Sequence, residues 1–81
     1  MWSENNKYLL REFEFSSFDK AQNFVFNVAG IAKELNHHPK ITWDYKKVIL
    51  ALTTHDKGCV TSLDYTLATA IDKILKSGFT S

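Results

Sequence analysis

The spacing of the apolar residues changes several times along this 81-residue chain, and these changes predict an order of strands and helices. Apolar and polar residues alternate from Tyr8 to Phe15, which is typical of a β-strand with one buried face. From Phe18 to Leu35 the apolar residues recur every three or four positions, which indicates an amphipathic helix of about five turns. Alternation returns in 41–45 and 48–54, and helical spacing follows in 63–75. The predicted order is strand, helix, strand, strand, helix.

Residues that favour helix ends stand at the boundaries of both helical segments. Ser16-Ser17 is placed to cap the first helix, and Pro39 disfavours helical geometry at the residue before it. The first helix is therefore expected to end near Asn36. The stretch Thr61-Ser62-Leu63-Asp64 has the form of a capping box, with Asp in place of the usual Glu, and Gly78 is placed to stop the second helix.

The helical spacing also predicts which side chains face inward. On the first helix the expected stripe contains Phe18, Ala21, Val25, Val28, Ala29, Ala32 and Leu35. Phe24 and Ile31 widen this stripe beyond the needs of one sheet face, so we expect the helix to have a second apolar surface available to another subunit. On the second helix the expected inward residues are Leu63, Leu67, Ala70, Ile71, Ile74 and Leu75.

A tight turn at Lys46-Lys47 would make the strands on either side of it antiparallel. The segment around Trp2 and Asn5-Asn6 is expected to add a short hairpin partner to the first strand. The predicted class is α+β, with a small antiparallel sheet of three to four strands and two helices packed on one face. Residues 1–81 are expected to form a single domain.

Composition excludes several classes of protein. Ten Lys and Arg residues against nine Asp and Glu leave the net charge near zero, which argues against direct binding of nucleic acid through its phosphates. The apolar runs are too short to span a membrane. Cys59 is the single cysteine, so an internal disulfide is excluded and a reducing compartment is expected. We therefore expect a cytoplasmic protein.

All three histidines lie in two short segments, Asn36-His37-His38-Pro39 and Thr53-Thr54-His55-Asp56. Antiparallel pairing of the second and third strands would bring these segments together at one sheet edge. Histidine exchanges protons near neutral pH, so neighbouring imidazoles suit the removal of a proton from one atom and its delivery to another. Two other interpretations stay open. The adjacent histidines would complement the dipole at the end of a helix, and three histidines plus water would suit a catalytic zinc ion.

A longer pattern contains both segments and covers nearly the whole chain from Trp2 to about Ile71. It runs Leu9-x-Arg11-x-Phe13-x-Phe15, Phe18, Ala21, Phe24-Val25, Val28-Ala29, Ala32, His37-His38-Pro39, Trp43, Tyr45, Val48, Leu52-x-Thr54-His55-Asp56, Gly58, Thr61 and Asp64. The pattern closely resembles the pterin-4a-carbinolamine dehydratase family. The resemblance implies a hydro-lyase that dehydrates 4a-hydroxytetrahydropterin to quinonoid dihydropterin during tetrahydrobiopterin recycling. Neither step of that reaction requires a metal, and no cofactor is expected.

The resemblance also implies the residues of the site. His38 and His55 are assigned to proton transfer, and His37 to binding or proton transfer. The residues expected to bind the pterin are Asn36, His37, His38, Thr53, Thr54, His55, Asp56 and Asp64. Trp43 and Tyr45 are expected in the sheet core or an interface. Many members of the family carry an acidic residue at the position of Lys33, so a carboxylate that orients a histidine is expected to be missing.

A second reading is a protein-binding module. Animal members of the family also act as dimerisation cofactors of a homeodomain transcription factor through a helix surface. A small core and a wide apolar stripe on the first helix equally favour self-association, so we expect a homodimer or homotetramer.

Overall fold

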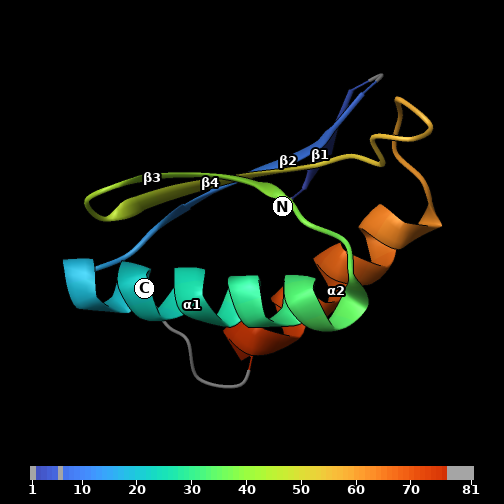
Figure 1. Ribbon diagram of the computed structural model, residues 1–81. Coiled ribbons are helices and arrows are strands. Elements are labelled where there is room, and N and C mark those ends of the chain that lie inside the picture. Colours follow the sequence, from blue (N-terminus) through green and yellow to red (C-terminus); the bar gives the residue numbers. More distant parts are fainter. Residues whose placement is uncertain (1, 6, 77–81) are drawn as a thin grey trace.

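The computed structural model describes residues 2–5 and 7–76, which form one layer of sheet and one layer of helices (Figure 1). The elements are β1 (Ser3–Glu4), β2 (Leu9–Glu14), α1 (Phe18–Leu35), β3 (Lys40–Asp44), β4 (Lys47–Leu52) and α2 (Ser62–Lys76). Both helices lie against the same face of the sheet, as the sequence predicted. Neither helix in this part of the chain has the length and apolar character needed to cross a bilayer.

The sheet is antiparallel throughout, with the strand order β1-β2-β4-β3. Its central pair runs from Leu9 opposite Leu52 to Glu14 opposite Lys47. The register directs one face of each central strand toward the helices, because side chains alternate along a strand. The core side chains of these strands are Leu9, Phe13, Val48, Leu50 and Leu52. The short β1 confirms the hairpin expected near Trp2, and the Asn5 side chain accepts hydrogen bonds from the amides of the turn.

The first helix begins where the sequence predicted, but its buried stripe is rotated. The Ser17 hydroxyl accepts a hydrogen bond from the Lys20 amide at 3.2 Å and caps the helix. Phe24 is fully buried and packs its ring 4.8 Å from that of Phe13. Phe24 and Ile31 both pack on the core, so the extra apolar width that they were expected to give the helix is used within this chain. The stripe follows Ala21, Phe24, Val28 and Ala32, which leaves Ala29 exposed and Phe18 and Leu35 partly exposed.

The hairpin between β3 and β4 turns one residue earlier than predicted. Asp44 pairs with Lys47, so the turn residues are Tyr45 and Lys46. Tyr45 adopts a φ of 56° and is 64% exposed, so it does not continue the strand. Its ring lies 6.0 Å from that of Phe18, which stacks on Trp43. Trp43 is half-buried and packs against the core, as expected.

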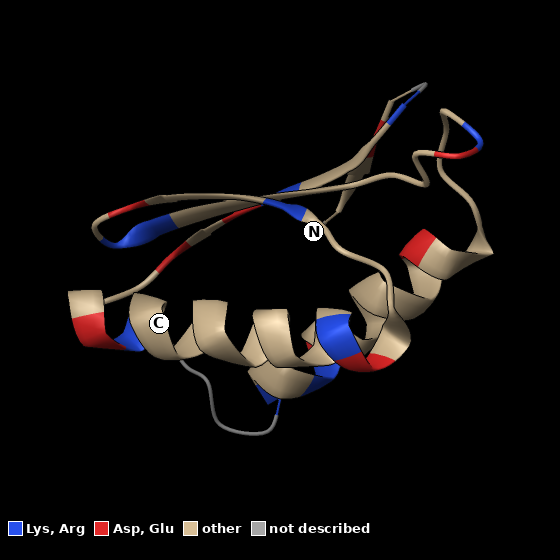
Figure 2. Ribbon diagram, viewed as in Figure 1, with Lys and Arg blue, Asp and Glu red and all other residues tan. Residues whose placement is uncertain are grey.

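The second helix buries Asp64, Leu67, Ala68 and Ile71. Leu63 was predicted to face inward but is 51% exposed, whereas its neighbour Asp64 in the same turn is completely buried. Asp72 on the same helix accepts hydrogen bonds from Trp2 and Arg11, both at 3.0 Å, and so fastens α2 beneath β2. Gly78, expected to stop this helix, lies outside the described residues. Acidic and basic residues are interspersed over the sheet and helices (Figure 2).

Candidate functional site

The end of α1 has a geometry that turns the chain toward α2. Asn36 adopts the left-handed conformation, with φ 53° and ψ 40°. The Asn36 amide donates to the Lys33 carbonyl, and the His37 amide donates to the Ala32 carbonyl at 3.0 Å. This pair of bonds is a Schellman motif, which Asn tolerates better than most residues because left-handed geometry costs it little. The helix thus ends at Leu35, and His37 leaves it at a defined angle.

An open pocket of about 420 Å³ lies where the segment after α1 meets the end of β4 and the start of α2. Its lining residues are Asn36, His37, His38, Pro39, Lys40, Thr53, Thr54, His55, Asp56 and Leu63. The two histidine-bearing segments therefore meet at one place, as antiparallel pairing of β3 and β4 requires. The volume lies in the range of small-molecule sites.

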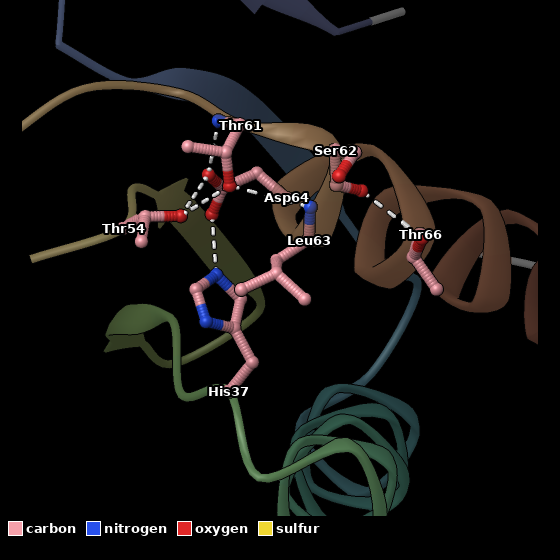
Figure 3. A network of polar contacts seen from close by, with 7 residues as sticks. All are labelled: His37, Thr54, Thr61, Ser62, Leu63, Asp64 and Thr66. Atoms are coloured by element: carbon pink, nitrogen blue, oxygen red, sulfur yellow. Dashed lines mark hydrogen bonds and ion pairs between the residues drawn. The ribbon is translucent and has the colours of Figure 1, made fainter. Parts of the chain in front are cut away.

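Asp64, in the first turn of α2, contacts the pocket residue His37 (Figure 3). His37 Nε2 lies 2.6 Å from Asp64 Oδ1. The other carboxylate oxygen accepts a hydrogen bond from the Thr54 hydroxyl at 2.8 Å and from the Thr61 amide at 2.9 Å. The amide bond is the expected capping-box contact, and Asp64 is completely buried. One carboxylate thus caps α2 and holds an imidazole at the pocket.

The charge on Asp64 follows from these contacts. Burial by itself would raise the pKa of the carboxyl group, because it penalises the ionised form. The hydrogen bonds from His37, the Thr61 amide and the Thr54 hydroxyl outweigh burial and hold the pKa of Asp64 below its ordinary value. Since the carboxylate is ionised and can only accept, His37 Nε2 carries the proton in this contact. The other ring nitrogen, Nδ1, has no hydrogen-bond partner among the described residues.

The remaining predicted site residues differ in their surroundings. His38 and His55 are exposed at the pocket, whereas the His37 side chain is only 12% exposed. Asp64 does not line the pocket and reaches it through His37. Lys33 is exposed and is absent from the pocket lining, so it does not occupy the place of a histidine partner. The carboxylate that the sequence appeared to lack is supplied by Asp64, from the other helix.

A family model described as pterin 4 alpha carbinolamine dehydratase matches residues 1–74. The chain belongs to this family. A protein from Chloroflexus aggregans is 48% identical over 75 residues, which are 91% of this chain and 80% of that protein. A protein from Prochlorococcus marinus strain MIT 9215 is 47% identical over 73 residues, covering 90% and 76% of the two chains. Both relatives are named, provisionally, pterin-4-alpha-carbinolamine dehydratases.

Solved structures support the same fold. A crystal structure described as a transcriptional coactivator/pterin dehydratase from Brucella melitensis has a TM-score of 0.85 and 32% identity, and the match covers 90% of this chain and 80% of that one. A pterin dehydratase-like protein identified as a RuBisCO assembly factor in the alpha-carboxysome has a TM-score of 0.76 over 89% of this chain and 86% of its own. Its identity is 23%, so this second likeness concerns the fold alone.

Within the family fold, three pocket residues and one supporting residue were not predicted from sequence. Pro39 and Lys40 line the pocket because they continue the segment after His38, and their position next to the histidines was the available signal. Leu63 was assigned to the core because helical spacing cannot show which part of a helix borders a pocket. Thr61 was recognised as a cap, but its hydroxyl also lies 2.6 Å from that of Thr54.

The described part of the chain contains no set of side chains arranged as zinc ligands. Across residues 2–5 and 7–76, no group of three or more His, Cys, Asp or Glu side chains is arranged to hold a metal ion. His37 Nε2 is already engaged by Asp64.

Proposed function

We propose that this member of the family dehydrates 4a-hydroxytetrahydropterin to quinonoid dihydropterin, in the recycling of tetrahydrobiopterin. The observation that carries the proposal is the pocket in which His37, His38 and His55 meet. Family membership supports the pterin as substrate. The single cysteine supports a reducing compartment, and we propose the cytoplasm as the site of action.

The reaction needs two proton transfers and no change of oxidation state. The ring nitrogen next to the carbinol carbon loses its proton, the C–O bond breaks, and the leaving hydroxyl gains a proton and departs as water. A carbon–nitrogen double bond remains. One group must accept a proton while another donates one, so neighbouring imidazoles suit the two roles.

We assign the transfers to His38 and His55, whose rings are exposed at the pocket. His37 binds the substrate or takes part in proton transfer through Nδ1, since its Nε2 proton is committed to Asp64. Asn36, Thr53 and Asp56 line the same pocket and are proposed to contact the pterin. Thr54 lines it as well, but its hydroxyl is engaged with Asp64 and Thr61. Leu63 adds an apolar wall against which a flat ring could pack.

Stopped-flow absorbance of freshly generated 4a-hydroxytetrahydropterin tests the proposal. Replacing His38 or His55 by Ala should lower turnover by roughly 10²- to 10⁴-fold, the usual contribution of a general acid or base. If the two histidines act as a unit, the double variant should lose less than the product of the single losses. Asn23→Ala, an exposed change on α1, serves as the control and should retain full activity.

Two outcomes would overturn the dehydratase proposal or its mechanism. Wild-type protein that does not exceed the spontaneous rate would refute the enzyme. Activity that is lost with a chelator and restored by zinc would replace the proton-transfer mechanism by a metal-assisted one. A folded but inactive protein would favour the alternative of a protein-binding module, which the description of the Brucella relative as a coactivator supports.

We also propose that the chain is a homodimer or homotetramer. The strand order leaves β3 at an edge of the sheet, beside the exposed rings of Phe18 and Tyr45. A second copy paired antiparallel about Thr42 would set Lys40 of one copy opposite Asp44 of the other, which is favourable. Sedimentation at micromolar concentration should show a species above 9.3 kDa, and Thr42→Lys should weaken it by placing like charges opposite each other.

A further inference from the structure

The hydroxyls of Thr54 and Thr61 form a line of hydrogen bonds that begins at the Leu63 amide and ends at the Asp64 carboxylate. The proposed reaction gives this line of hydrogen bonds no role. The Leu63 amide donates to Thr61 Oγ1 at 3.3 Å. Thr61 Oγ1 lies 2.6 Å from Thr54 Oγ1, which in turn donates to Asp64 Oδ2 at 2.8 Å. Figure 3 shows these groups in sequence, ending at the carboxylate that contacts His37.

The number of available protons shows which group donates in each of these hydrogen bonds. Each threonine hydroxyl has one proton to donate. Thr54 donates its proton to the ionised Asp64, so it can only accept from Thr61. Thr61 therefore donates to Thr54 and accepts from the Leu63 amide. All three hydrogen bonds therefore donate in the direction of the Asp64 carboxylate. Hydrogen bonds aligned in this way polarise one another in a buried site.

We propose that Thr54 and Thr61 are positioning residues that keep Asp64 an acceptor and thereby hold His37 in the Nε2–H tautomer, with Nδ1 free at the pocket. This inference rests on the proposed function for its catalytic consequence. It also reassigns Thr54, which the family resemblance implied as a pterin-binding residue. That hydroxyl is buried and already engaged with Asp64 and Thr61.

The groups around Asp64 support this role. His37, from the segment after α1, is the titratable group in contact with its carboxylate. The contacts from the end of β4 and the start of α2 are uncharged, namely the Thr54 hydroxyl and the Thr61 amide. These donors lower the pKa of Asp64 against the effect of burial. Without the Thr54 donor, the carboxyl group should take up a proton at a higher pH.

Thr54→Val tests the proposal because it replaces one hydroxyl by a methyl group of nearly the same size. We expect a loss in kcat of about tenfold to a hundredfold, the range for removing a hydrogen bond to a charged group, with little change in KM. Direct substrate binding by Thr54 would instead raise KM. The acid limb of the pH–rate profile should move to higher pH, and Thr54→Ser should restore both kcat and the limb.

The tautomer can be read without any substrate. Nitrogen-15 NMR of the full-length protein, with the His37 signals assigned by their loss in His37→Gln, should show protonated Nε2 and unprotonated Nδ1 in the neutral ring. Thr54→Val leaves the carboxylate ionised at neutral pH but with one donor fewer to fix its orientation, so the share of the Nδ1–H tautomer should rise. Thr66→Val is the matched control, because it removes an exposed hydroxyl whose one hydrogen bond among the described residues is to the Ser62 carbonyl. This control should change neither the tautomer nor kcat.

An unchanged tautomer and an unchanged acid limb in folded Thr54→Val would overturn the proposal. If that variant does not fold, Thr61→Val interrupts the same chain at its other end, and its tautomer decides. A wild-type protein without dehydratase activity refutes the proposed function but leaves the tautomer measurement to judge the positioning role on its own.

Discussion

Replacing Asp64 by Asn tests the central contact of the site with almost no change in shape. The wild-type carboxylate accepts three hydrogen bonds, from His37, Thr54 and the Thr61 amide. An amide keeps one acceptor oxygen and presents N–H groups on its other side. If these face His37, Nε2 must become the acceptor and the ring proton must move to Nδ1. The change therefore removes the charge and reverses the imidazole.

The cost in stability can be worked out from the three contacts. A hydrogen bond to a charged group contributes about 1.5–3 kcal/mol and a neutral one about 0.5–1.5 kcal/mol, so each contact loses roughly 1 kcal/mol. Three such losses make about 3 kcal/mol, in line with the cost of breaking a buried charge pair. For a domain of this size the melting temperature should fall by about 12–24 °C. Turnover should fall by up to about 10⁴-fold, as when a catalytic histidine is held in the wrong tautomer.

Thermal unfolding from pH 7 to pH 2 provides the assay. Because the pKa of folded Asp64 lies below its ordinary value of 3.8, the carboxylate stabilises the fold above that pH. This stabilisation is lost as the pH falls through the lower folded value, so wild type and Asp64→Asn should converge in acid. Asp72→Asn is the control, since Asp72 is 40% exposed and its ion pair with Arg11 should contribute under about 1 kcal/mol. Equal melting curves for wild type and Asp64→Asn at every pH would refute the reasoning.

Three further predictions concern the rest of the molecule. Phe24→Ala should lower the free energy of unfolding in urea by about 3–5 kcal/mol because Phe24 is fully buried, whereas Phe26→Ala, at a side chain 62% exposed, should change it by less than about 0.5 kcal/mol; similar losses would contradict the observed orientation of α1. Asn36→Ala should cost about 1 kcal/mol in the same assay because of its left-handed geometry, and Asn36→Gly should cost less; a costlier Gly would argue against the Schellman motif. The Tyr65 hydroxyl donates to Glu4, which raises the pKa of Tyr65, so this contact stabilises the fold below pH 10 and is lost as the pH rises through the folded value; ultraviolet titration should show that Tyr65 ionises at a lower pH in Glu4→Gln than in wild type, and an unchanged titration would contradict the contact.

Sequence reasoning was most successful where the physical cause is local. Alternating and helical spacings come directly from the geometry of strands and helices, so the order of elements and the α+β class were predicted and are confirmed. The Ser17 cap and the end of α1 near Asn36 depend on residues within one turn of each helix end. The antiparallel β3–β4 hairpin required the two histidine segments to approach each other, and both line one pocket.

Other features depended on which elements pack together, and local spacing does not contain that information. The buried stripe of α1 centres on Phe24 because its ring packs against two rings from the sheet layer. These are Phe13 in β2 and Phe15, which directly follows β2. The expected turn at Lys46-Lys47 moved by one residue because pairing with β4 set the register. Leu63 became part of the pocket because the start of α2 meets the segment after α1 and the end of β4 there.

The amino-acid sequence by itself determined the strands, the helices, their caps and the positions of the three histidines, because each follows from residues that are neighbours in the chain. Only the tertiary structure decided which carboxylate forms a hydrogen bond with His37. Asp64 meets His37 across 27 positions, where Lys33 had suggested that no such partner was present. That contact exists because the end of α1, the end of β4 and the start of α2 converge, and a buried carboxylate must find its hydrogen-bond donors among whatever groups the packing brings to it.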